Sequence, residues 1–547
     1  MKHLRYLDLS GSKFDFLPET LCTLYNLQTL NLSYSRVSKL PEGLRCMISL
    51  RHLIFKGCEN LKKMPIGLGQ LKGLRTLTEY MVDCDPGLNI RELKNLNLHG
   101  CLILTGLENV RDKHEAEAAN MGSKTKLCSL ALNWGSPKNA QANRNDQEVL
   151  GGLKPGELNY LYIHGYEGFD FPTWMKEAIV LRNLQTLRLF DCNNCTALFP
   201  LWRLPLLENI ELYNLRNLSY ICTIGIAEAE VSGDLTFPNL KKMEMSVLYN
   251  LEGWHEKNHK LEFPKLEDLR IARCPKLKSI PCAPSLRNFA VHYPRRIKLL
   301  EISTMLMITS SELRISLDFN HIEPDAFKPP RNVEFMELRG FENVIPLEED
   351  DKESWQNMAL RHLIISTSSC FFSGGRSKLA LGFWKYFWSL ETLEIDSCDA
   401  LCSWPEHEFR SLKCLKELRI FGCENFTYSS QVSSSENDAD GEDLLPRLEK
   451  LHISGCPKLV EIPNCYKSLK SLRLGSCPSL SNEGLNWLKN LHELKELELA
   501  HCVGLKSLPD GLEDLNSLMH LSLIGCPGIE SIPEGLQQRL LNFKLTL

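Results

Sequence analysis

The chain has 547 residues, of which 43% are hydrophobic and 24% are charged, and its formal net charge is -5. This is the composition of an ordinary folded protein, and it lacks the basic surplus that nucleic-acid binding requires. No apolar run reaches the roughly 18 residues that a membrane-spanning helix needs. Because a single compact core stops growing well below this length, the chain must divide into domains or extend in one dimension.

A short apolar pattern recurs along the chain and favours extension in one dimension. Leucine or another apolar residue fills the first, fourth and sixth positions of a six-residue segment, and the segments at 4–9, 27–32 and 50–55 begin 23 residues apart. The copies start at residues 4, 27, 50, 127, 158, 184, 207, 240, 266, 286, 333, 360, 390, 415, 448, 469, 494 and 518, with a degenerate copy at Leu74. This is the period of leucine-rich repeats, whose strands stack because one repeat cannot bury its leucines alone.

The pattern therefore predicts an α/β solenoid. We expect a leucine-rich-repeat horseshoe with a parallel β-sheet on the concave face and short helices, turns and loops on the convex face. Apolar-Pro steps between the strands, such as Leu17-Pro18 and Leu40-Pro41, are expected to begin the short convex-side helices or turns.

Cysteine is abundant, and nine of the 21 cysteines stand eight residues after the first apolar position of a repeat. A thiol is small and forms weak hydrogen bonds, so we expect these side chains to form a buried ladder where the backbone leaves each strand. The ladder favours reduced thiols and a cytoplasmic location. Its members are Cys58, Cys192, Cys274, Cys398, Cys423, Cys456, Cys477, Cys502 and Cys526.

The array is uneven along the chain. Regular repeats without an N-terminal cap occupy 1–78, an irregular insert with a short helix at 112–121 occupies 79–126, and repeats resume at 127–291. A degenerate bend is predicted at 292–332, followed by Cys-rich-type repeats at 333–547. Polar composition predicts a loop at 135–150 and a disordered loop at 429–443. Since an uncapped end repeat exposes its leucines, we expect the chain to be the C-terminal part of a longer protein or a truncation.

Sequence motifs do not favour catalysis. The sequence contains no phosphate-binding loop, kinase signature or Gly-x-Ser-x-Gly elbow. His255-Glu256-Lys257-Asn258-His259 has the spacing of zinc peptidases, but we expect this segment to be an exposed loop between repeats, without an apolar helix face. We predict that the chain is not an enzyme and has no catalytic, cofactor-binding or metal-binding residues.

The residues between the leucines are the candidates for function, because they point away from the core onto the concave sheet. Exposed aromatic residues and arginine are common interface anchors. We predict partner-binding residues at Arg5, Tyr6, Arg51, His52, Tyr160, Tyr162, Glu334, Phe335, Glu337, Glu391 and Glu394. An acidic band is expected to include Glu208, Glu211, Glu244, Glu267 and Asp268 as well, diluted by Lys241, Lys242, Arg270 and Arg361.

Several segments carry a family resemblance. They are residues 3–10 (His-Leu-Arg-Tyr-Leu-Asp-Leu-Ser), 106–110 (Gly-Leu-Glu-Asn-Val), Gly165-Tyr166, 171–175 (Phe-Pro-Thr-Trp-Met) and 453–459 (Ile-Ser-Gly-Cys-Pro-Lys-Leu). In these segments the chain resembles the leucine-rich-repeat part of plant intracellular nucleotide-binding disease-resistance proteins of the coiled-coil class. The resemblance covers essentially the whole chain and includes the insert, whereas the coiled coil and the nucleotide switch have no counterpart in this sequence.

The resemblance implies a role in plant defence. The chain would be a sensor segment that binds a pathogen effector or a guarded host protein through its concave face and restrains a nucleotide-binding switch domain. ADP or ATP would be bound by that absent domain alone. The implied location is cytoplasmic or nucleo-cytoplasmic, the implied partners are proteins, and neither nucleic acid nor a membrane span is expected.

Two other interpretations stay open at this stage. The substrate-receptor subunit of a ubiquitin ligase can have similar Cys-containing repeats, but no segment before Leu4 can form an adaptor-binding module. A zinc hydrolase would depend on His255, Glu256 and His259 alone.

Overall fold

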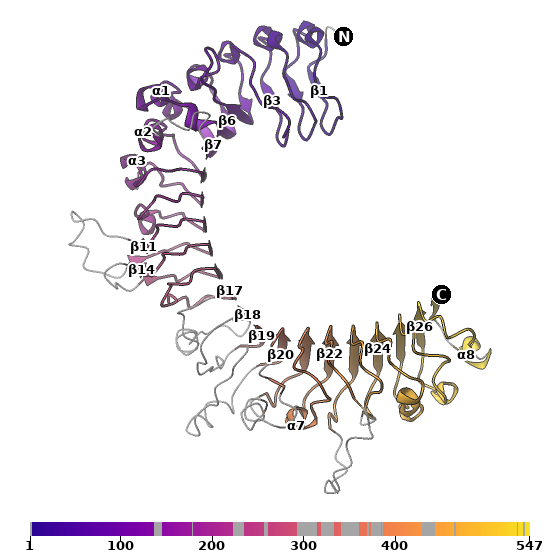
Figure 1. The fold of residues 1–547 in the computed structure, drawn as a ribbon. Coiled ribbons are helices and arrows are strands. Elements are labelled where there is room, and N and C mark those ends of the chain that lie inside the picture. The colour runs from indigo at the N-terminus through magenta and orange to yellow at the C-terminus, as the bar shows by residue number, and fades with distance from the viewer. Residues whose placement is uncertain are drawn as a thin grey trace. The chain divides into compact units, whose positions relative to one another are not determined.

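The computed structural model describes residues 3–135, 145–177, 179–222, 235–255, 261–292, 314–318, 333–340, 360–368, 371–372, 384, 387–428, 444–463, 466–532, 534–539 and 542–546. The chain divides into two compact units, unit 1 at 1–283 and unit 2 at 284–547. In each unit, parallel strands lie side by side along one face, and the helices and turns follow the other face (Figure 1). The predicted leucine-rich-repeat solenoid is confirmed.

Unit 1 contains two successive sheets of parallel strands. The first consists of β1 (Tyr6–Asp8), β2 (Thr29–Asn31), β3 (His52–Ile54) and β4 (Thr76–Leu77). The second follows with β5 (Glu79–Met81), β6 (His99–Thr105), β7 (Lys126–Asn133), β8 (Tyr160–His164), β9 (Thr186–Phe190), β10 (Asn209–Tyr213), β13 (Lys242–Ser246) and β16 (Asp268–Ala272).

Unit 2 continues the same architecture. Its strands are β17 (Asn288–His292), β18 (Arg314–Asp318), β19 (Phe335–Arg339), β20 (His362–Ser366), β21 (Thr392–Asp396), β22 (Glu417–Phe421), β23 (Lys450–Ser454), β24 (Ser471–Gly475), β25 (Glu496–Ala500), β26 (His520–Ile524) and β27 (Asn542–Thr546). Each strand pairs in parallel with the next one.

The face opposite the strands carries short helices, as predicted. In unit 1 these are the 3₁₀ helices η1 (Glu19–Thr23), η2 (Glu42–Cys46), η3 (Leu68–Gln70), η4 (Ile90–Leu93), η5 (Leu107–Asn109), η6 (Met121–Ser123) and η7 (Leu201–Arg203), with α1 (Lys113–Glu117), α2 (Asp146–Gly152) and α3 (Thr173–Lys176). Unit 2 has α7 (Glu406–Phe409), η11 (Glu483–Asn490), η12 (Leu512–Asp514) and α8 (Glu534–Arg539). Pro18, Pro41 and Pro405 stand directly before η1, η2 and α7, because proline fixes φ and needs no amide partner there.

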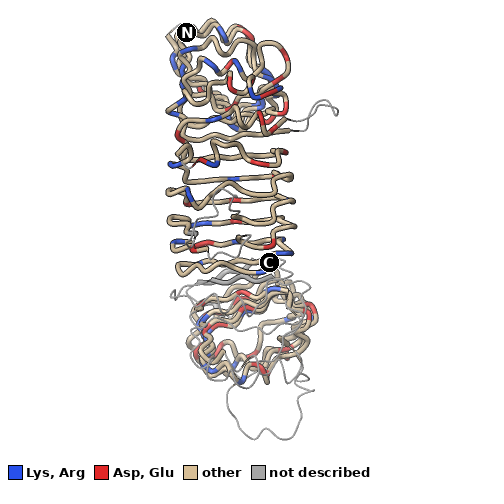
Figure 2. Tube along the Cα trace, turned by 90° about the vertical axis from the view of Figure 1, so that its left-hand side faces the viewer, with Lys and Arg blue, Asp and Glu red and all other residues tan. Residues whose placement is uncertain are grey.

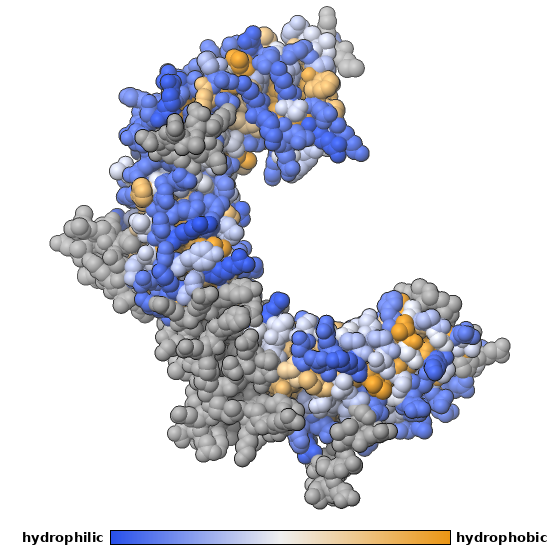
Figure 3. Space-filling view, viewed as in Figure 1, coloured by the Kyte–Doolittle hydropathy of each residue, from blue (hydrophilic) through white to orange (hydrophobic). Residues whose placement is uncertain are grey.

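Two pairs of extra strands lie outside the main sheets of unit 1. They are β11 (Tyr220–Cys222) with β14 (Gly253–His255), and β12 (Leu235–Thr236) with β15 (Leu261–Glu262). The core is the stack of apolar positions; in β2, for example, Leu27, Leu30 and Leu32 are fully buried. On the face of unit 1 that Figure 3 shows, hydrophilic residues predominate and apolar ones are scattered.

Most of the described repeats leave their strand through the same turn, and the repeat that starts at residue 127 is an exception. The residue seven positions after the first apolar one has a positive φ, which is 54° at Asp191, 53° at His501 and 72° at Gly165. Its amide donates to the neighbouring strand, as Gly165 does to the carbonyl oxygen of Phe190 at 3.0 Å. A side chain at Gly165 would collide with the carbonyl oxygen of Trp134, so glycine is required there by both conformation and close approach.

The predicted cysteine ladder follows directly after this turn and is confirmed. All nine thiols are buried, and the most exposed is Cys58 at 7%. The Cys502 thiol donates to the carbonyl oxygens of Ala500 at 3.5 Å and Leu474 at 3.7 Å, so it joins its own strand to the preceding one. Burial raises the pKa of Cys192 and Cys456 to about 12. These two thiols therefore stay protonated and act as small buried donors.

Thiol labelling of the native protein should separate the ladder from the other cysteines. With iodoacetamide at about pH 8, exposed Cys46 and Cys282 should be alkylated first, because thiolates react and buried thiols with raised pKa values do not ionise. Cys456 and Cys502 should be modified only after unfolding in urea. Peptide mass spectrometry measures both rates, and rapid alkylation of Cys456 in the native state would contradict the ladder.

The insert at 79–126 is more regular than predicted, because it contributes two strands to the sheet. Tyr80 of β5 and the following Val82 are buried at apolar positions of this repeat. The register between β6 and β7 shifts between Gly100 and Cys101, where Cys128 of β7 is passed over. In this irregular repeat the buried residues Leu98, Leu102 and Leu104 do not keep the six-residue spacing, which hides the repeat from a search at fixed spacing.

The predicted helix at 112–121 is present but shorter. α1 spans Lys113–Glu117, and the Asp112 side chain accepts a hydrogen bond from the Glu115 amide, which caps the helix. The predicted loop at 135–150 is wrong in its C-terminal part, since α2 begins at Asp146 and buries Val149 and Leu150. Residues 136–144 lie outside the described residues.

The stretch predicted as a degenerate bend, 292–332, contains one described strand. β18 crosses this stretch and pairs with β17 and β19 in the usual register. The fixed pattern missed it because Glu312 stands at its first apolar position. Residues 293–313 and 319–332, and the predicted disordered loop at 429–443, lie outside the described residues.

A buried lysine joins distant segments within the insert. Lys124 is 1% exposed, and its ammonium donates to the carbonyl oxygens of Leu93 at 2.9 Å, Leu96 at 3.1 Å and Asn120 at 3.4 Å. Leu93 ends η4 and its carbonyl also accepts from the Leu96 amide, so the lysine adds a charged donor where this helix ends. Burial lowers the pKa of Lys124 from 10.5 to about 8.

This lowered pKa predicts a pH dependence of stability. Between about pH 8 and pH 10.5 the unfolded chain binds a proton at Lys124 that the folded chain has released, so the contribution of this lysine to the free energy of unfolding rises with pH. Urea unfolding of the wild type and Lys124→Met at pH 7.5 and pH 10 measures it. The free energy of unfolding of the wild type, relative to that of Lys124→Met, should be higher at pH 10 than at pH 7.5. If the difference in free energy of unfolding is the same at both pH values, the lowered pKa is contradicted.

Candidate partner-binding surface

Strands β8, β9 and β10 of unit 1 present their outward side chains in three rows. Paired residues lie directly beside one another across parallel strands, so the register determines which side chains meet. The rows are Tyr160–Thr186–Asn209, Tyr162–Arg188–Glu211 and His164–Phe190–Tyr213.

Four of these side chains form a continuous aromatic cluster, namely Tyr162, His164, Phe190 and Tyr213, and Tyr160 adjoins it through Arg188. The ring centroids of Tyr162 and Phe190 are 5.4 Å apart, and those of Phe190 and Tyr213 are 5.5 Å apart. Tyr162 also stacks on His164 with centroids 6.2 Å apart. The rings are half-buried except for Tyr213, which is 42% exposed. The cluster therefore offers apolar area to a partner while its own geometry is held by the sheet.

Polar contacts orient the cluster. The Arg188 guanidinium lies over the Tyr160 ring, 5.8 Å from its centroid, and its Nη2 donates to Glu211 Oε1 at 2.8 Å. His164 Nε2 lies 3.0 Å from Asp191 Oδ2. Burial raises the pKa of Tyr162, which keeps its phenol in the protonated form. The surface thus combines aromatic rings with paired charges.

The structure brings together some of the predicted site residues and separates others. Tyr162 belongs to the aromatic cluster and Tyr160 adjoins it through Arg188, whereas Tyr6 and His52 lie in the first sheet, on β1 and β3. The Tyr6 hydroxyl donates to Asp8 Oδ2 at 2.9 Å, and His52 Nδ1 lies 2.9 Å from Thr76 Oγ1. Arg5 and Arg51 are exposed directly before those two strands.

In unit 2 the predicted residues are divided between two places. Glu334 and the strand residues Phe335 and Glu337 are half-buried at β19. Phe335 faces His362 of β20, with ring centroids 6.5 Å apart.

The other predicted acids of unit 2 are engaged with cations. Glu391 accepts from Lys416 at 2.8 Å and pairs with Arg361 at 3.3 Å, and its pKa is lowered chiefly by the Lys416 hydrogen bond. Glu394 pairs with Arg419 at 3.3 Å.

Direct ion pairs also replace most of the acidic band predicted for unit 1. Glu208 pairs with Lys241 at 3.0 Å, Glu244 with Lys242 at 3.8 Å and Asp268 with Arg270 at 3.1 Å. Figure 2 shows the acidic and basic positions interleaved along the trace. The predicted dilution by basic neighbours is confirmed, and the face is a ladder of alternating charges rather than an acidic surface.

Sequence reasoning missed His164, Arg188, Phe190 and Tyr213. Arg188 stands at the fifth position of its repeat, where no pattern singles out one side chain. The other three stand at the seventh position, one residue beyond the six-residue motif. Strand alternation carried to the seventh position would have found them, because positions three, five and seven share one face.

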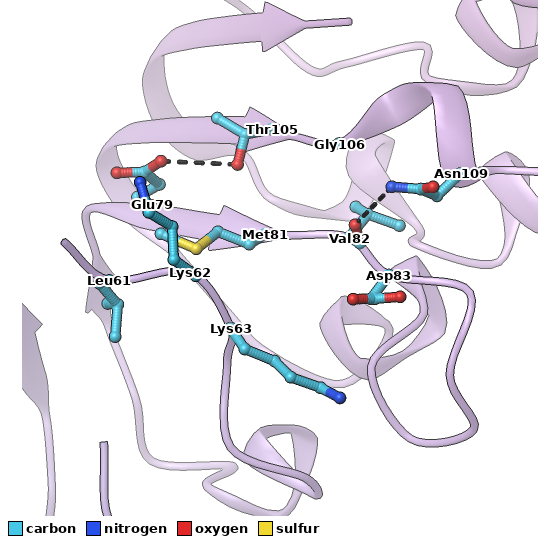
Figure 4. A pocket seen from close by; sticks show the side chains of 10 residues that line it. All are labelled: Leu61, Lys62, Lys63, Glu79, Met81, Val82, Asp83, Thr105, Gly106 and Asn109. Carbon is cyan, nitrogen blue, oxygen red and sulfur yellow. Dashed lines mark hydrogen bonds between the residues drawn. The ribbon is translucent and has the colours of Figure 1, made fainter. Parts of the chain in front are cut away.

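A different concavity lies where the first sheet of unit 1 meets the second. It has a volume of about 300 Å³ and is lined by residues that include Glu79, Met81, Thr105 and Asn109 (Figure 4). Thr105 Oγ1 donates to Glu79 Oε1 at 3.5 Å, and Asn109 Nδ2 donates to the Val82 carbonyl oxygen at 3.0 Å. Burial raises the pKa of Glu79. Because these polar groups form hydrogen bonds with one another or with the backbone, we interpret the concavity as a structural junction between the two sheets.

The segment with zinc-peptidase spacing differs from its prediction. His255 is not exposed: it ends β14 and is 3% exposed. Glu256 and His259 lie outside the described residues. Among the residues that are described, no three His, Cys, Asp or Glu side chains are grouped so that they could hold a metal ion. Across the same part of the chain, no helix has the length and apolarity needed to cross a bilayer.

Two families of leucine-rich repeats match the region that holds the aromatic cluster. The family described as R13L1/DRL21 LRRs matches residues 90–215, which include much of the insert, and the family described as plant disease resistance protein RPS2-like, leucine-rich repeats, matches residues 173–289. A general Leucine Rich Repeat family matches residues 3–24. Between residues 90 and 289 the repeats of this chain are thus similar to the leucine-rich repeats that these two families describe, one of them from plant disease-resistance proteins.

Individual relatives agree with this assignment. Putative disease resistance protein RGA1 of Solanum bulbocastanum is 32% identical over 290 residues, which are 52% of this chain and 28% of the relative. Putative disease resistance protein RGA4 of the same species is 32% identical over 383 residues, 61% of this chain and 38% of the relative. Putative disease resistance RPP13-like protein 1 of Arabidopsis thaliana is 34% identical over 291 residues, 51% of this chain and 28% of the relative. The chain spans less than two fifths of the length of these disease-resistance relatives, and the kinship supports a role in plant defence.

Proposed function

We propose that this chain is the sensor segment of a cytoplasmic plant immune receptor. Its concave sheet would bind a pathogen effector or a guarded host protein, and the chain would restrain a nucleotide-binding switch domain. The aromatic cluster on β8, β9 and β10 is the observation that carries the binding part of this proposal.

The chemistry of the cluster suits a protein partner. Tyr, Trp and Arg dominate the energetics of protein interfaces, because they bury a large area and place a polar group at its edge. Tyr162, Phe190 and Tyr213 touch in series across three strands, so a partner would meet one contiguous surface. The sheet holds their backbones, which reduces the entropy lost on binding.

The surrounding ion pairs support specificity. Arg188 with Glu211 and His164 with Asp191 flank the rings, and a partner must match this charge pattern to displace water from them. In unit 2, Phe335 beside Glu334 and Glu337 offers a second set of outward-facing groups. We treat the two regions as separate candidate surfaces, one in each unit, with the unit 1 cluster as the anchor of the proposed binding.

Restraint of a switch domain is the part of the proposal that depends on kinship. The relatives are disease-resistance proteins much longer than the matched repeats. A repeat segment that contacts both a partner and a switch can couple the two when they favour different states of the receptor. Loss of restraint would appear as defence signalling in the absence of any partner.

Double alanine substitution in the cluster tests the binding proposal. Phe190→Ala with Tyr213→Ala should weaken binding of the recognised effector or guarded protein about tenfold or more, because it removes two adjacent anchor rings. The measurement uses the full-length gene product with a panel of candidate partners in leaf tissue, scored by cell death, followed by titration of the purified pair.

The matched control is Tyr25→Ala with Tyr249→Ala, two tyrosines of unit 1 that are 60% and 45% exposed in turns outside the sheet. The control should retain wild-type affinity and response. If the cluster variant and the control bind the partner with equal affinity, the binding proposal is wrong. Cell death without a partner in the cluster variant would instead indicate that this face restrains the switch domain.

A further inference from the structure

Unit 1 contains a basic pocket at the N-terminal ends of its strands, at a distance in sequence from the aromatic cluster. The pocket has a volume of about 310 Å³, and its lining includes five basic side chains. We define the basic pocket by Arg51, Lys72, Arg75, His99 and Lys126.

Strand stacking assembles these residues. Arg51 and Arg75 stand directly before β3 and β4, and His99 and Lys126 are the first residues of β6 and β7. The backbone fixes them relative to one another, since the Arg75 amide donates to the Arg51 carbonyl at 2.7 Å and the His99 amide donates to the Arg75 carbonyl at 2.7 Å. The repeat framework thus holds positive charges at one edge before any ligand arrives.

The charges in the pocket lack carboxylate partners. No ion pair joins Arg51, Lys72, Arg75 or Lys126 to an acid within the part of the chain that the structure describes. This contrasts with the concave face, where Arg188, Arg270 and Arg419 each pair with a carboxylate. The remaining lining residues, Gly73, Leu74 and Asn97, are neutral.

The surroundings of His99 in the basic pocket lower its pKa. Burial and then the charges of Lys126 and Arg75 lower the pKa of His99. Like charges held this close repel one another, and an anion placed among them removes that repulsion. Natural surfaces usually intersperse the two signs of charge, so a concave site with one sign favours a ligand of the opposite sign.

We propose that this basic pocket binds a compact ligand that carries two or more phosphate groups. Guanidinium groups match phosphate oxygens in paired hydrogen bonds, and lysine adds a point charge. The volume lies at the small end of small-molecule sites, so the ligand is no larger than a few phosphate groups on a short scaffold. A free phosphorylated metabolite and a phosphorylated lipid headgroup share this chemistry.

Calorimetric titration of the full chain with sodium tripolyphosphate tests the site directly. One equivalent should bind at low salt, and the affinity should fall as KCl is raised, because the contacts are ionic. Arg51→Gln with Arg75→Gln should weaken binding about tenfold or more, since charged hydrogen bonds are lost. Arg51→Lys with Arg75→Lys should weaken it less, because the charge stays.

The matched control is Lys13→Gln with Lys56→Gln, which removes the same charge from exposed positions of unit 1 outside the pocket. The control should bind tripolyphosphate as the wild type does. Equal loss in the control and the pocket variant would overturn the proposal, because attraction would then come from overall charge. Thermal unfolding of each variant shows that the fold is retained.

Two further binding experiments identify whether the phosphate groups belong to a lipid or to a free ligand. Phosphatidylcholine vesicles with and without a phosphorylated phosphatidylinositol distinguish a lipid headgroup from a free ligand, and pocket-dependent binding in either arm supports the proposal. A poly-glutamate peptide that binds through the pocket more tightly than tripolyphosphate would overturn it in favour of an acidic protein segment.

Discussion

The turn that ends each strand is the constraint on which the rest of the molecule depends. In most of the described repeats a residue in the left-handed conformation directs the chain out of the sheet, and in nine repeats a buried thiol then bonds to nearby backbone carbonyls. If one repeat left its strand a residue early or late, its leucines would rotate to the solvent face. The turn therefore keeps the apolar positions stacked and the outward side chains in rows.

Those rows turn residues that are distant in sequence into surfaces. Tyr162, Phe190 and Tyr213 come from three repeats and meet only because β8, β9 and β10 share one register. The same register places Arg51, Arg75 and Lys126 at one edge. One surface is aromatic with balanced charge and suits a protein, whereas the other is a basic concavity and suits clustered phosphates. Exposed ion pairs such as Glu208 with Lys241 add little stability and matter more for the choice of partner.

Much of this fold could be predicted from the spacing of apolar residues, because burial of one face is what that spacing records. The misses have physical causes. The register between β6 and β7 shifts at Gly100, the tyrosine Tyr80 fills an apolar position, and Glu312 stands at an apolar position of β18. α2 was missed because its two buried residues lie in a polar segment.

The candidate surface was harder to predict than the fold. Tyr160 and Tyr162 were found, but Phe190 and Tyr213 stand beyond the motif, and their contact depends on register between repeats. The neighbours of the predicted acidic band depend on register in the same way. In the folded chain the Glu391 carboxylate lies against Lys416 and Arg361, and the sequence alone does not show these contacts.

Side-chain footprinting of the full-length protein, with and without its bound partner, tests the central claim most directly. Hydroxyl radicals oxidise exposed aromatic rings, and mass spectrometry reports the rate at each one. The account predicts that a bound partner protects Tyr162, Phe190 and Tyr213 and leaves Tyr25 and Tyr249 unchanged. Protection of Tyr249 with undiminished oxidation of the three cluster rings would contradict it.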